Sequence, residues 1–327
     1  MKDRQKNTGM NYLIKKSILF FVGLVLLCQV FELYQKSLVY HVKYRTWLYN
    51  EKWSYLNNSV NKIDILILGS SKGFSGINPR IIDSVSHWRC YNMCTPLQCP
   101  KESYYILKYG IEHFQLKTII LDVYWNIFAE KPDLINAYEN WIHLPEMEKL
   151  KFSLSDGNYE FPAAVGFPVI KYSVGINFKN IIPNLFYSLN KPLHDTAQWK
   201  LGFFGDKKKL TKNMRLKGGT ILILPPLEES MKYLRLIDSI CASSRCQLIV
   251  LETPVPVSTL KKYKGLDVFH KKIMQNIRNG NFIFFDEPFP DSLFADYLHL
   301  NATGATVISS KIIPLIKNPK EICYSIR

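Results

Sequence analysis

The feature that most constrains the fold is an apolar run, residues 63–68, that ends abruptly in small residues. The run reads Ile-Asp-Ile-Leu-Ile-Leu, and Gly69, Ser70 and Ser71 follow it directly. Such a run is typical of a strand buried on both faces of a parallel sheet. Ligands bind at the carboxyl edge of such sheets, because the loops diverge there. We therefore expect the hydroxyl of Ser71 at the mouth of a crevice, on a turn that Gly69 and Gly73 allow to bend sharply.

A second segment, near the C-terminal end, changes how this turn is interpreted. Taken alone, a Gly-Ser-Ser turn is more often purely structural, because serine hydroxyls satisfy the turn's own backbone. Asp296 and His299, however, stand three residues apart just before an apolar-periodic segment, with Asn301 as its expected N-cap. A carboxylate beside an imidazole fixes the tautomer and stabilises the cation that forms on proton uptake. That is the base which the hydroxyl of Ser71 needs to become a nucleophile.

These two segments resemble the SGNH/GDSL superfamily of hydrolases and acyl transferases. In that family a serine follows the first strand and an Asp-x-x-His pair precedes the last helix. Many members have aspartate at the position of Ser70, so the Gly-Ser-Ser start is closer to the membrane-anchored branch. That branch includes the teichoic-acid D-alanyl transfer protein and proteins that acetylate exopolysaccharides. The resemblance implies that Ser71 is the nucleophile, His299 the base and Asp296 the orienting acid.

The same resemblance implies groups that would stabilise the developing oxyanion. A loop after the second strand supplies a backbone amide in this family, usually from glycine, and Cys94 or Thr95 occupies that position here. A side-chain amide after the next strand is the second donor, and Asn126 is the candidate. A loop asparagine is at least as often bonded to its own backbone, and the sequence does not decide between these roles for Asn126.

Strands and helices alternate through the rest of the chain. This order predicts an α/β fold with a parallel sheet and helices on both faces. The resemblance implies a three-layer α/β/α arrangement around a five-stranded sheet, SGNH-like and flavodoxin-like. We expect strands at residues 63–68, 89–93, 117–123, 247–252 and 282–285, and helices at 77–86, 102–114, 227–241, 260–279 and after residue 301.

The α/β domain is expected to be discontinuous, formed by residues 63–126 and 227–327. Between them the periodic pattern breaks down over residues 127–226, which hold many prolines and aromatics. A segment of that length is too long for a connection inside a compact sheet. We therefore interpret it as an inserted cap that supplies specificity for the acyl donor or acceptor.

The N-terminal segment predicts a single membrane anchor. We expect residues 1–16 to be a basic cytoplasmic tail, 17–34 a transmembrane helix and 35–62 a juxtamembrane segment. A cleaved signal peptide shares the basic start and the apolar run, but no small-residue cleavage site follows here. The positive-inside rule then places the globular domain outside the inner or cytoplasmic membrane, in the periplasm or the cell exterior.

Charge and cysteine content narrow the class further. A net charge of +15 could serve nucleic acid, but no nucleic-acid module is apparent, and anionic lipids or acidic envelope polymers fit better. Among the seven cysteines we expect disulfides Cys90–Cys99 and Cys241–Cys246 in the extracytoplasmic compartment. The competing zinc site lacks a four-ligand spacing, so no metal and no other cofactor is expected.

The sequence thus predicts a membrane-anchored, extracytoplasmic serine esterase or O-acyltransferase that acts on cell-envelope or secreted polysaccharide. The expected partners are an acylated carbohydrate or envelope polymer and a multi-span membrane protein that delivers acyl groups. The alternative is a catalytically inactive protein of the same fold that binds or assembles such a polysaccharide. A dinucleotide enzyme is disfavoured, because the first turn lacks Gly-x-Gly-x-x-Gly.

Overall fold

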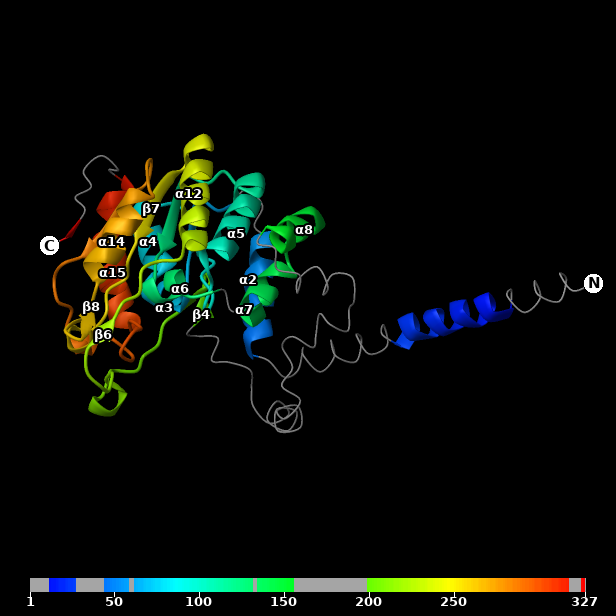
Figure 1. The fold of residues 1–327 in the computed structure, drawn as a ribbon. Helices are drawn as coiled ribbons and strands as arrows, with labels where there is room; N and C mark the ends of the chain where they lie inside the picture. Colours follow the sequence, from blue (N-terminus) through cyan, green and yellow to red (C-terminus); the bar gives the residue numbers. More distant parts are fainter. Residues whose placement is uncertain are drawn as a thin grey trace, which may run out of the picture. The chain divides into compact units, whose positions relative to one another are not determined.

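The computed structural model describes residues 12–27, 44–58, 62–131, 134–155, 199–317 and 325–326. The chain falls into two compact units, one made of residues 1–48 and 146–193 and the other of residues 49–145 and 194–327. The second unit contains every candidate site residue and the sheet. Figure 1 shows the sheet with the helices that pack on it. The predicted cap, residues 127–226, is divided between the two units, and its residues 156–198 lie outside the described part of the chain.

The second unit is built on a parallel sheet, so the predicted α/β class with five parallel strands is confirmed. The order of these strands across the sheet is β2-β1-β3-β7-β9. Strands β3, β7 and β9 follow one another on one side of β1, and β2 lies on the other side of β1. A two-residue strand that the sequence did not predict, β10 (Ser325–Ile326), extends the edge beside β9. The five strands are β1 (Ile65–Leu68), β2 (Cys90–Asn92), β3 (Thr118–Asp122), β7 (Gln247–Leu251) and β9 (Asn281–Phe285).

Burial explains why these segments are strands. All four residues of β1 are fully buried, and β1 pairs in register with β3 from Ile65 opposite Thr118 to Leu68 opposite Leu121. A strand with neighbours on both sides and helices above and below favours apolar side chains along its length. The unbroken apolar run therefore places β1 in the sheet interior, and the small residues after it reach the carboxyl edge.

Two groups of helices pack on the sheet. In one group α5 (Pro100–His113) contacts β1 and α12 (Glu228–Ser243), which lies on β7. In the other, α15 (Ala302–Lys317) contacts α3 (Ser71–Gly76) and α4 (Pro79–Ser86). The chain moves toward one edge of the sheet from β1 to β2, through α4, and toward the opposite edge from β2 to β3, through α5. Because both crossovers are right-handed, α4 and α5 lie on opposite faces of the sheet.

Further helices and two small ladders surround these elements in the described chain. The helices are α2 (Tyr44–Asn58), α6 (Trp125–Ala129), α7 (Leu134–Trp141), α8 (Glu146–Leu154), α13 (Val257–Leu260) and α14 (Leu266–Gln275), with 3₁₀ turns at Lys212–Met214 and Asp291–Leu293. Two small ladders join β4 (Trp199–Lys200) to β5 (Phe203–Phe204) and β6 (Ile221–Leu222) to β8 (Tyr263–Lys264).

The predicted helix over residues 260–279 is wrong at its start. Residues 263–264 form β8 instead, and α14 begins only at Leu266, directly after Gly265. Gly265 has a φ of 94°, a left-handed conformation that favours glycine and interrupts a helix. The last helix, by contrast, begins where the sequence predicts, because the side-chain oxygen of Asn301 accepts a 3.0 Å hydrogen bond from the backbone of Gly304.

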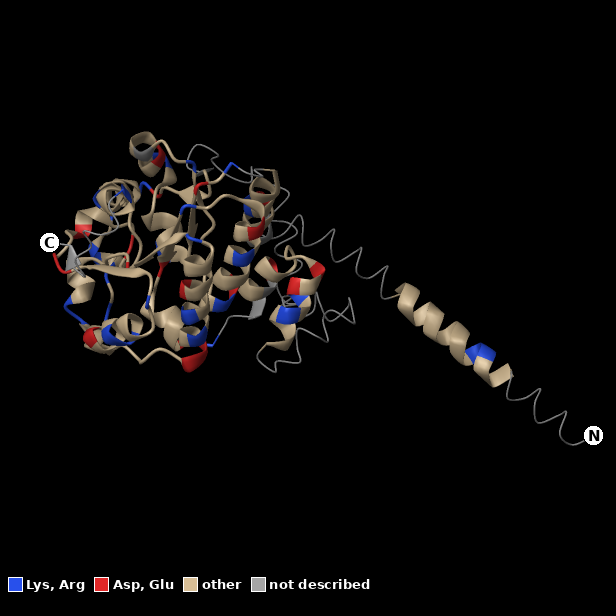
Figure 2. Ribbon diagram, turned by 90° about the horizontal axis from the view of Figure 1, so that it is seen from above, with Lys and Arg blue, Asp and Glu red and all other residues tan. Residues whose placement is uncertain are grey.

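The predicted transmembrane segment, residues 17–34, is described in part. Residues 12–27 are helical, and their only charged side chains, Lys15 and Lys16, lie near the N-terminal end of that helix (Figure 2). Residues 28–34 lie outside the described chain. Within the described ranges, none of the helices combines the length and the apolar character needed to cross a membrane.

The predicted disulfides are wrong for the described chain, whose cysteines are free thiols: Cys90, Cys94, Cys99, Cys241 and Cys246. The thiol of Cys246 donates instead to the carbonyl of Leu116 at 3.0 Å. Burial raises the pKa of the Cys241 thiol, which keeps it protonated and unreactive. The described residues also contain no group of three or more His, Cys, Asp or Glu side chains that could hold a metal ion.

Candidate active site

Ser71 occupies the first position of α3, at the carboxyl end of β1. Ser70 is the N-cap residue, and its hydroxyl accepts a long hydrogen bond of 3.4 Å from the backbone of Lys72. Gly69 makes the sharp turn possible with a φ of 137°, and a Cβ there would lie 2.6 Å from the carbonyl oxygen of Asp122. The turn therefore passes directly against β3, and it presents a half-buried Ser71 at the edge of the sheet.

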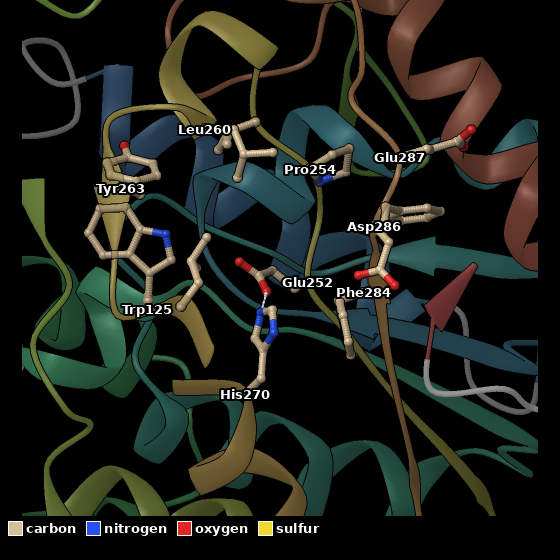
Figure 3. A pocket seen from close by; sticks show the side chains of 12 residues that line it. Trp125, Glu252, Pro254, Leu260, Tyr263, His270, Phe284, Asp286 and Glu287 are labelled. Atoms are coloured by element: carbon tan, nitrogen blue, oxygen red, sulfur yellow. Dashed lines mark hydrogen bonds and ion pairs between the residues drawn. The ribbon is translucent and has the colours of Figure 1, made fainter. Parts of the chain in front are cut away.

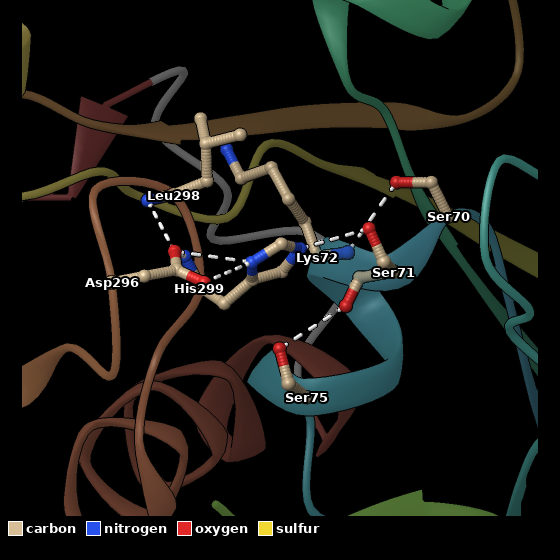
Figure 4. A network of polar contacts seen from close by, with 7 residues as sticks. All are labelled: Ser70, Ser71, Lys72, Ser75, Asp296, Leu298 and His299. Carbon is tan, nitrogen blue, oxygen red and sulfur yellow. Dashed lines mark hydrogen bonds and ion pairs between the residues drawn. The ribbon is translucent and has the colours of Figure 1, made fainter. Parts of the chain in front are cut away.

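The structure brings Ser71, His299 and Asp296 into one hydrogen-bonded line (Figure 4). Nε2 of His299 lies 2.9 Å from Oγ of Ser71, and Nδ1 of His299 lies 2.9 Å from Oδ2 of Asp296. The side chains of His299 and Asp296 are 29% and 35% exposed, so a ligand can reach the line from solvent. The predicted proximity is thus found, while the catalytic roles of these residues stay a prediction.

The turn between β9 and α15 holds the acid and the imidazole together. The backbone of Ala295 donates to the carbonyl of His299 at 2.8 Å, which closes the turn. Oδ1 of Asp296 accepts hydrogen bonds from the backbone N–H groups of Leu298 at 2.7 Å and His299 at 2.8 Å. The carboxylate is therefore fixed by its own turn before it contacts the imidazole.

Asp296 is charged in this setting. Burial alone would raise the pKa of its carboxyl group, but the hydrogen bond and the electrostatic interaction with His299, together with the two backbone N–H groups, outweigh burial and lower that pKa. A carboxylate on Nδ1 leaves Nε2 of His299 free to accept the proton of Ser71. The geometry is that of a general base beside a nucleophile.

A buried carboxylate that the sequence analysis missed, Asp122, supports the turn that carries Ser71. Asp122 ends β3 and is 2% exposed. Its oxygens accept hydrogen bonds from the backbone of Gly73 at 2.9 Å, from the hydroxyl of Thr253 at 2.9 Å and from the hydroxyl of Ser70 at 3.4 Å. Burial raises the pKa of Asp122, and the nearby Lys72 and the hydrogen bonds from Thr253 and Gly73 oppose that rise. Asp122 thus ties the ends of β1, β3 and β7 together.

Lys72, the residue after Ser71, is a second buried support that the sequence analysis missed. It is 1% exposed, and its Nζ donates to the carbonyl of Thr253 at 2.5 Å. Burial lowers the pKa of Lys72, whereas the charges of Glu252 and Asp122 raise it. A lysine in a loop is ordinarily taken as a surface residue. The sequence does place Asp122 and Lys72 at the carboxyl ends of predicted buried strands, and this position was the available signal that they belong to the site.

The two backbone amides among the predicted oxyanion donors already have acceptors within the fold, and the oxyanion role of these residues stays a prediction. The backbone N–H of Cys94 donates to the side chain of Asn92 at 3.0 Å, and that of Thr95 donates to the carbonyl of Gly69 at 3.1 Å. Asn126 is a half-buried residue of α6, and no hydrogen bond joins its side chain to Ser71 or His299.

One donor does remain at the nucleophile itself. The backbone N–H of Ser71 has no acceptor within the described part of the chain, because it lies at the first position of α3, where helix amides have no intrahelical partner. An amide at that position lies at the N-terminal end of the helix, which is the positive end of the helix dipole. It can therefore donate to negative charge that develops beside Oγ.

Comparison with known proteins adds no evidence on this site. No protein-family model matches the chain, and no curated protein sequence matches it either. The interpretation of the site therefore rests on its residues and their geometry.

Proposed function

We propose that this protein is an SGNH-type serine esterase or O-acyltransferase that uses Ser71, His299 and Asp296. The hydrogen-bonded line from Asp296 through His299 to Ser71 is the observation that carries this proposal. Oγ of Ser71 attacks the carbonyl carbon of an ester while Nε2 of His299 takes its proton. His299 returns that proton to the departing alkoxide, which leaves an acyl group on Ser71.

The second half of the reaction passes the acyl group on. His299 takes a proton from water or from a sugar hydroxyl, the new oxygen attacks the acyl carbon, and Oγ of Ser71 leaves with the proton. We propose envelope or secreted polysaccharide as the carbohydrate, acted on outside a membrane to which the N-terminal segment anchors the chain. The net charge of +15 supports an acidic polymer as partner. The acyl donor is proposed to come from a multi-span membrane protein.

A second candidate function is a polysaccharide-binding or assembly protein without catalysis. The internal hydrogen bonds of the Cys94 and Thr95 amides favour it, because they leave few donors for an oxyanion. This candidate predicts that the carbohydrate binds equally well whether or not Ser71 is present.

Hydrolysis and transfer by the purified full chain test the proposal. The chain is mixed in detergent with an O-acetylated oligosaccharide and an unacetylated acceptor, and the products are followed by mass spectrometry. Ser71→Ala is expected to lower acetate release and transfer by about 10³-fold or more. The matched control is Ser84→Ala, which removes an exposed hydroxyl on α4 that bonds only the carbonyl of Ile81. Equal turnover by wild type and Ser71→Ala would leave only the binding function.

A further inference from the structure

A separate cavity of about 170 Å³ opens at the carboxyl ends of β7 and β9 (Figure 3). Trp125 and Tyr263 form one wall, with ring centroids 4.8 Å apart in an edge-to-face arrangement. Phe284, on β9, lies on the other side. Glu252, the residue after β7, projects between these walls. The cavity is thus a small aromatic-walled pocket with a carboxylate in its interior.

The charge of this cavity is opposite to that of the chain. Twelve residues line it; three are acidic, Glu252, Asp286 and Glu287, one is His270, and none is lysine or arginine. The chain as a whole carries a net charge of +15. An acidic pocket on a basic protein marks a place where the preferred ligand differs from that of the surrounding surface.

The carboxylates differ in their partners. Glu252 is 9% exposed, and its carboxylate pairs with Nε2 of His270, a residue of α14. Glu287 points away from the cavity and pairs with Lys311 of α15 at 2.5 Å (Figure 3). Asp286 is exposed and points toward the cavity, and it has no ion pair within the described ranges. Asp286 therefore offers an unneutralised carboxylate at the mouth.

Other nearby charge does not line the cavity. The charge of Glu252 raises the pKa of Lys72, but the ammonium of Lys72 is bonded to the carbonyl of Thr253, and neither Lys72 nor Thr253 is among the lining residues. A buried carboxylate with aromatic neighbours disfavours binding of an anionic ligand in the cavity. An apolar ligand would give Glu252 and Asp286 no further partner. A positive occupant satisfies both the carboxylates and the ring faces, since aromatic faces attract cations.

The size and the ligand set decide between kinds of cation. Within the described chain, no three acidic, histidine or cysteine side chains are arranged to hold a metal ion. Pockets for whole drug-sized ligands measure roughly 300–1,000 Å³, so a cavity of about 170 Å³ takes one small group. An alkylated or primary ammonium group combines that size with positive charge and with apolar carbon that can contact Trp125 and Tyr263.

We propose that this cavity binds an organic ammonium group, primary or quaternary, between the rings of Trp125, Tyr263 and Phe284 and the carboxylates of Glu252 and Asp286. Contacts connect the cavity to the segment that carries Ser71: the ring of Trp125 packs edge-to-face on that of Tyr124 with centroids 4.8 Å apart, and Nζ of Lys72, the residue after Ser71, lies 5.3 Å from the centre of the Tyr124 ring.

Binding of choline to the full chain in detergent tests the assignment by titration calorimetry, with 3,3-dimethylbutan-1-ol as a neutral molecule of the same shape. Choline is expected to bind saturably and the neutral alcohol at least tenfold more weakly. Asp286→Asn is expected to weaken choline about fivefold, as loss of an exposed charge pair does. Trp125→Leu is expected to weaken it about tenfold, through loss of the ring face.

The controls separate this site from general effects and from catalysis. Asp267→Asn removes an equal charge from an exposed residue of α14 that does not line the cavity, and it is expected to leave choline binding unchanged. Equal binding of choline and the neutral alcohol, equal losses in Asp286→Asn and Asp267→Asn, or no choline binding to wild type would each overturn the assignment. Because the readout is binding, Ser71→Ala must bind choline like wild type even where the proposed catalysis fails.

Discussion

In the folded chain Nε2 of His299 lies 2.9 Å from Oγ of Ser71, although 228 positions separate the two residues in the sequence. Each partner is held by a different part of the sheet edge. Ser71 is held by the turn between β1 and α3, which rests on Asp122, and His299 is held by the turn that leads into α15. Variants of the hydrogen-bonded side chains therefore test the chemistry, and variants of the groups that hold the two turns test how the contact is positioned.

The acid of the line gives the first prediction. Asp296→Asn keeps the shape of the side chain but no longer favours the tautomer with a proton on Nδ1 of His299. We expect kcat for ester hydrolysis to fall about 10⁴-fold with little change in stability. Steady-state kinetics against Asp267→Asn as control check this expectation. Retention of more than a tenth of wild-type kcat by Asp296→Asn would remove Asp296 from the mechanism.

The buried support gives the second prediction. Asp122→Asn replaces a carboxylate that accepts from Ser70, Gly73 and Thr253 with an amide that has only one acceptor oxygen. Because the substitution leaves at least one of these buried donors without an acceptor, we expect a loss of about 2–3 kcal/mol in the free energy of unfolding, measured in urea. Thr253→Val removes a single donor and should cost about 1 kcal/mol. A smaller loss in Asp122→Asn than in Thr253→Val would contradict the supporting role.

The close approach of α3 to β3 gives the third prediction. A Cβ at Gly73 would lie 2.7 Å from the Cβ of Asp122 and 2.8 Å from the sulfur of Cys94. We expect Gly73→Ala to destabilise the fold by about 1–3 kcal/mol, because the Cβ of Asp122 is attached directly to the backbone of β3 and cannot withdraw without moving it. Gly219→Ala is the matched control, since a Cβ there meets nothing within 4 Å. Thermal melts of the two variants that coincide would show that the packing at Gly73 is looser than described.

Asp64 gives a prediction about pH. Burial would raise the pKa of this carboxyl group, but hydrogen bonds from Arg89 and the ion pair with Lys117 outweigh it and lower the pKa to about 2. The unfolded value is about 4, so the stabilisation is present above pH 4 and is lost as pH falls toward 2. Arg89 and Lys117 are 57% and 52% exposed, which limits the contribution to about 1 kcal/mol.

Urea unfolding at several pH values between 2.5 and 6 measures this contribution. The difference between wild type and Asp64→Asn should be largest near pH 6 and should shrink as the solution becomes acidic. Glu228→Gln, which removes the carboxylate of an exposed pair with Arg235, serves as the control. A difference that stays constant across this range would show that Asp64 gains nothing from its partners.

The fold was largely predictable because burial acts on whole segments. The interior strand β1 is apolar throughout, and five segments with buried apolar residues, separated by helix-length stretches, leave few arrangements other than a parallel sheet. β10 has two residues and carries no comparable pattern. The start of α14 depends on the left-handed conformation of Gly265, which a periodic pattern that continues through residue 265 does not reveal.

The site was predictable only where chemistry restricts residue type. A serine, a histidine and an aspartate at strand ends can be found from sequence, because few residues perform those roles. Asp122 and Lys72 were missed, because nothing in the sequence indicates that both charged side chains are buried and that each affects the pKa of the other. The internal acceptors of the Cys94 and Thr95 amides could not be predicted for a related reason: backbone partners depend on the final path of the loop.

Covalent labelling with a fluorophosphonate probe is the most direct test of the central claim, that His299 makes Ser71 a nucleophile. The full chain in detergent is treated with the probe, and the modified residue is identified by peptide mass spectrometry. The account predicts one modified site at Ser71, at least 100-fold slower labelling in His299→Gln, no labelling in Ser71→Ala and wild-type labelling in Ser84→Ala. Wild-type protein that stays unmodified, or labelling that persists in Ser71→Ala, would contradict it.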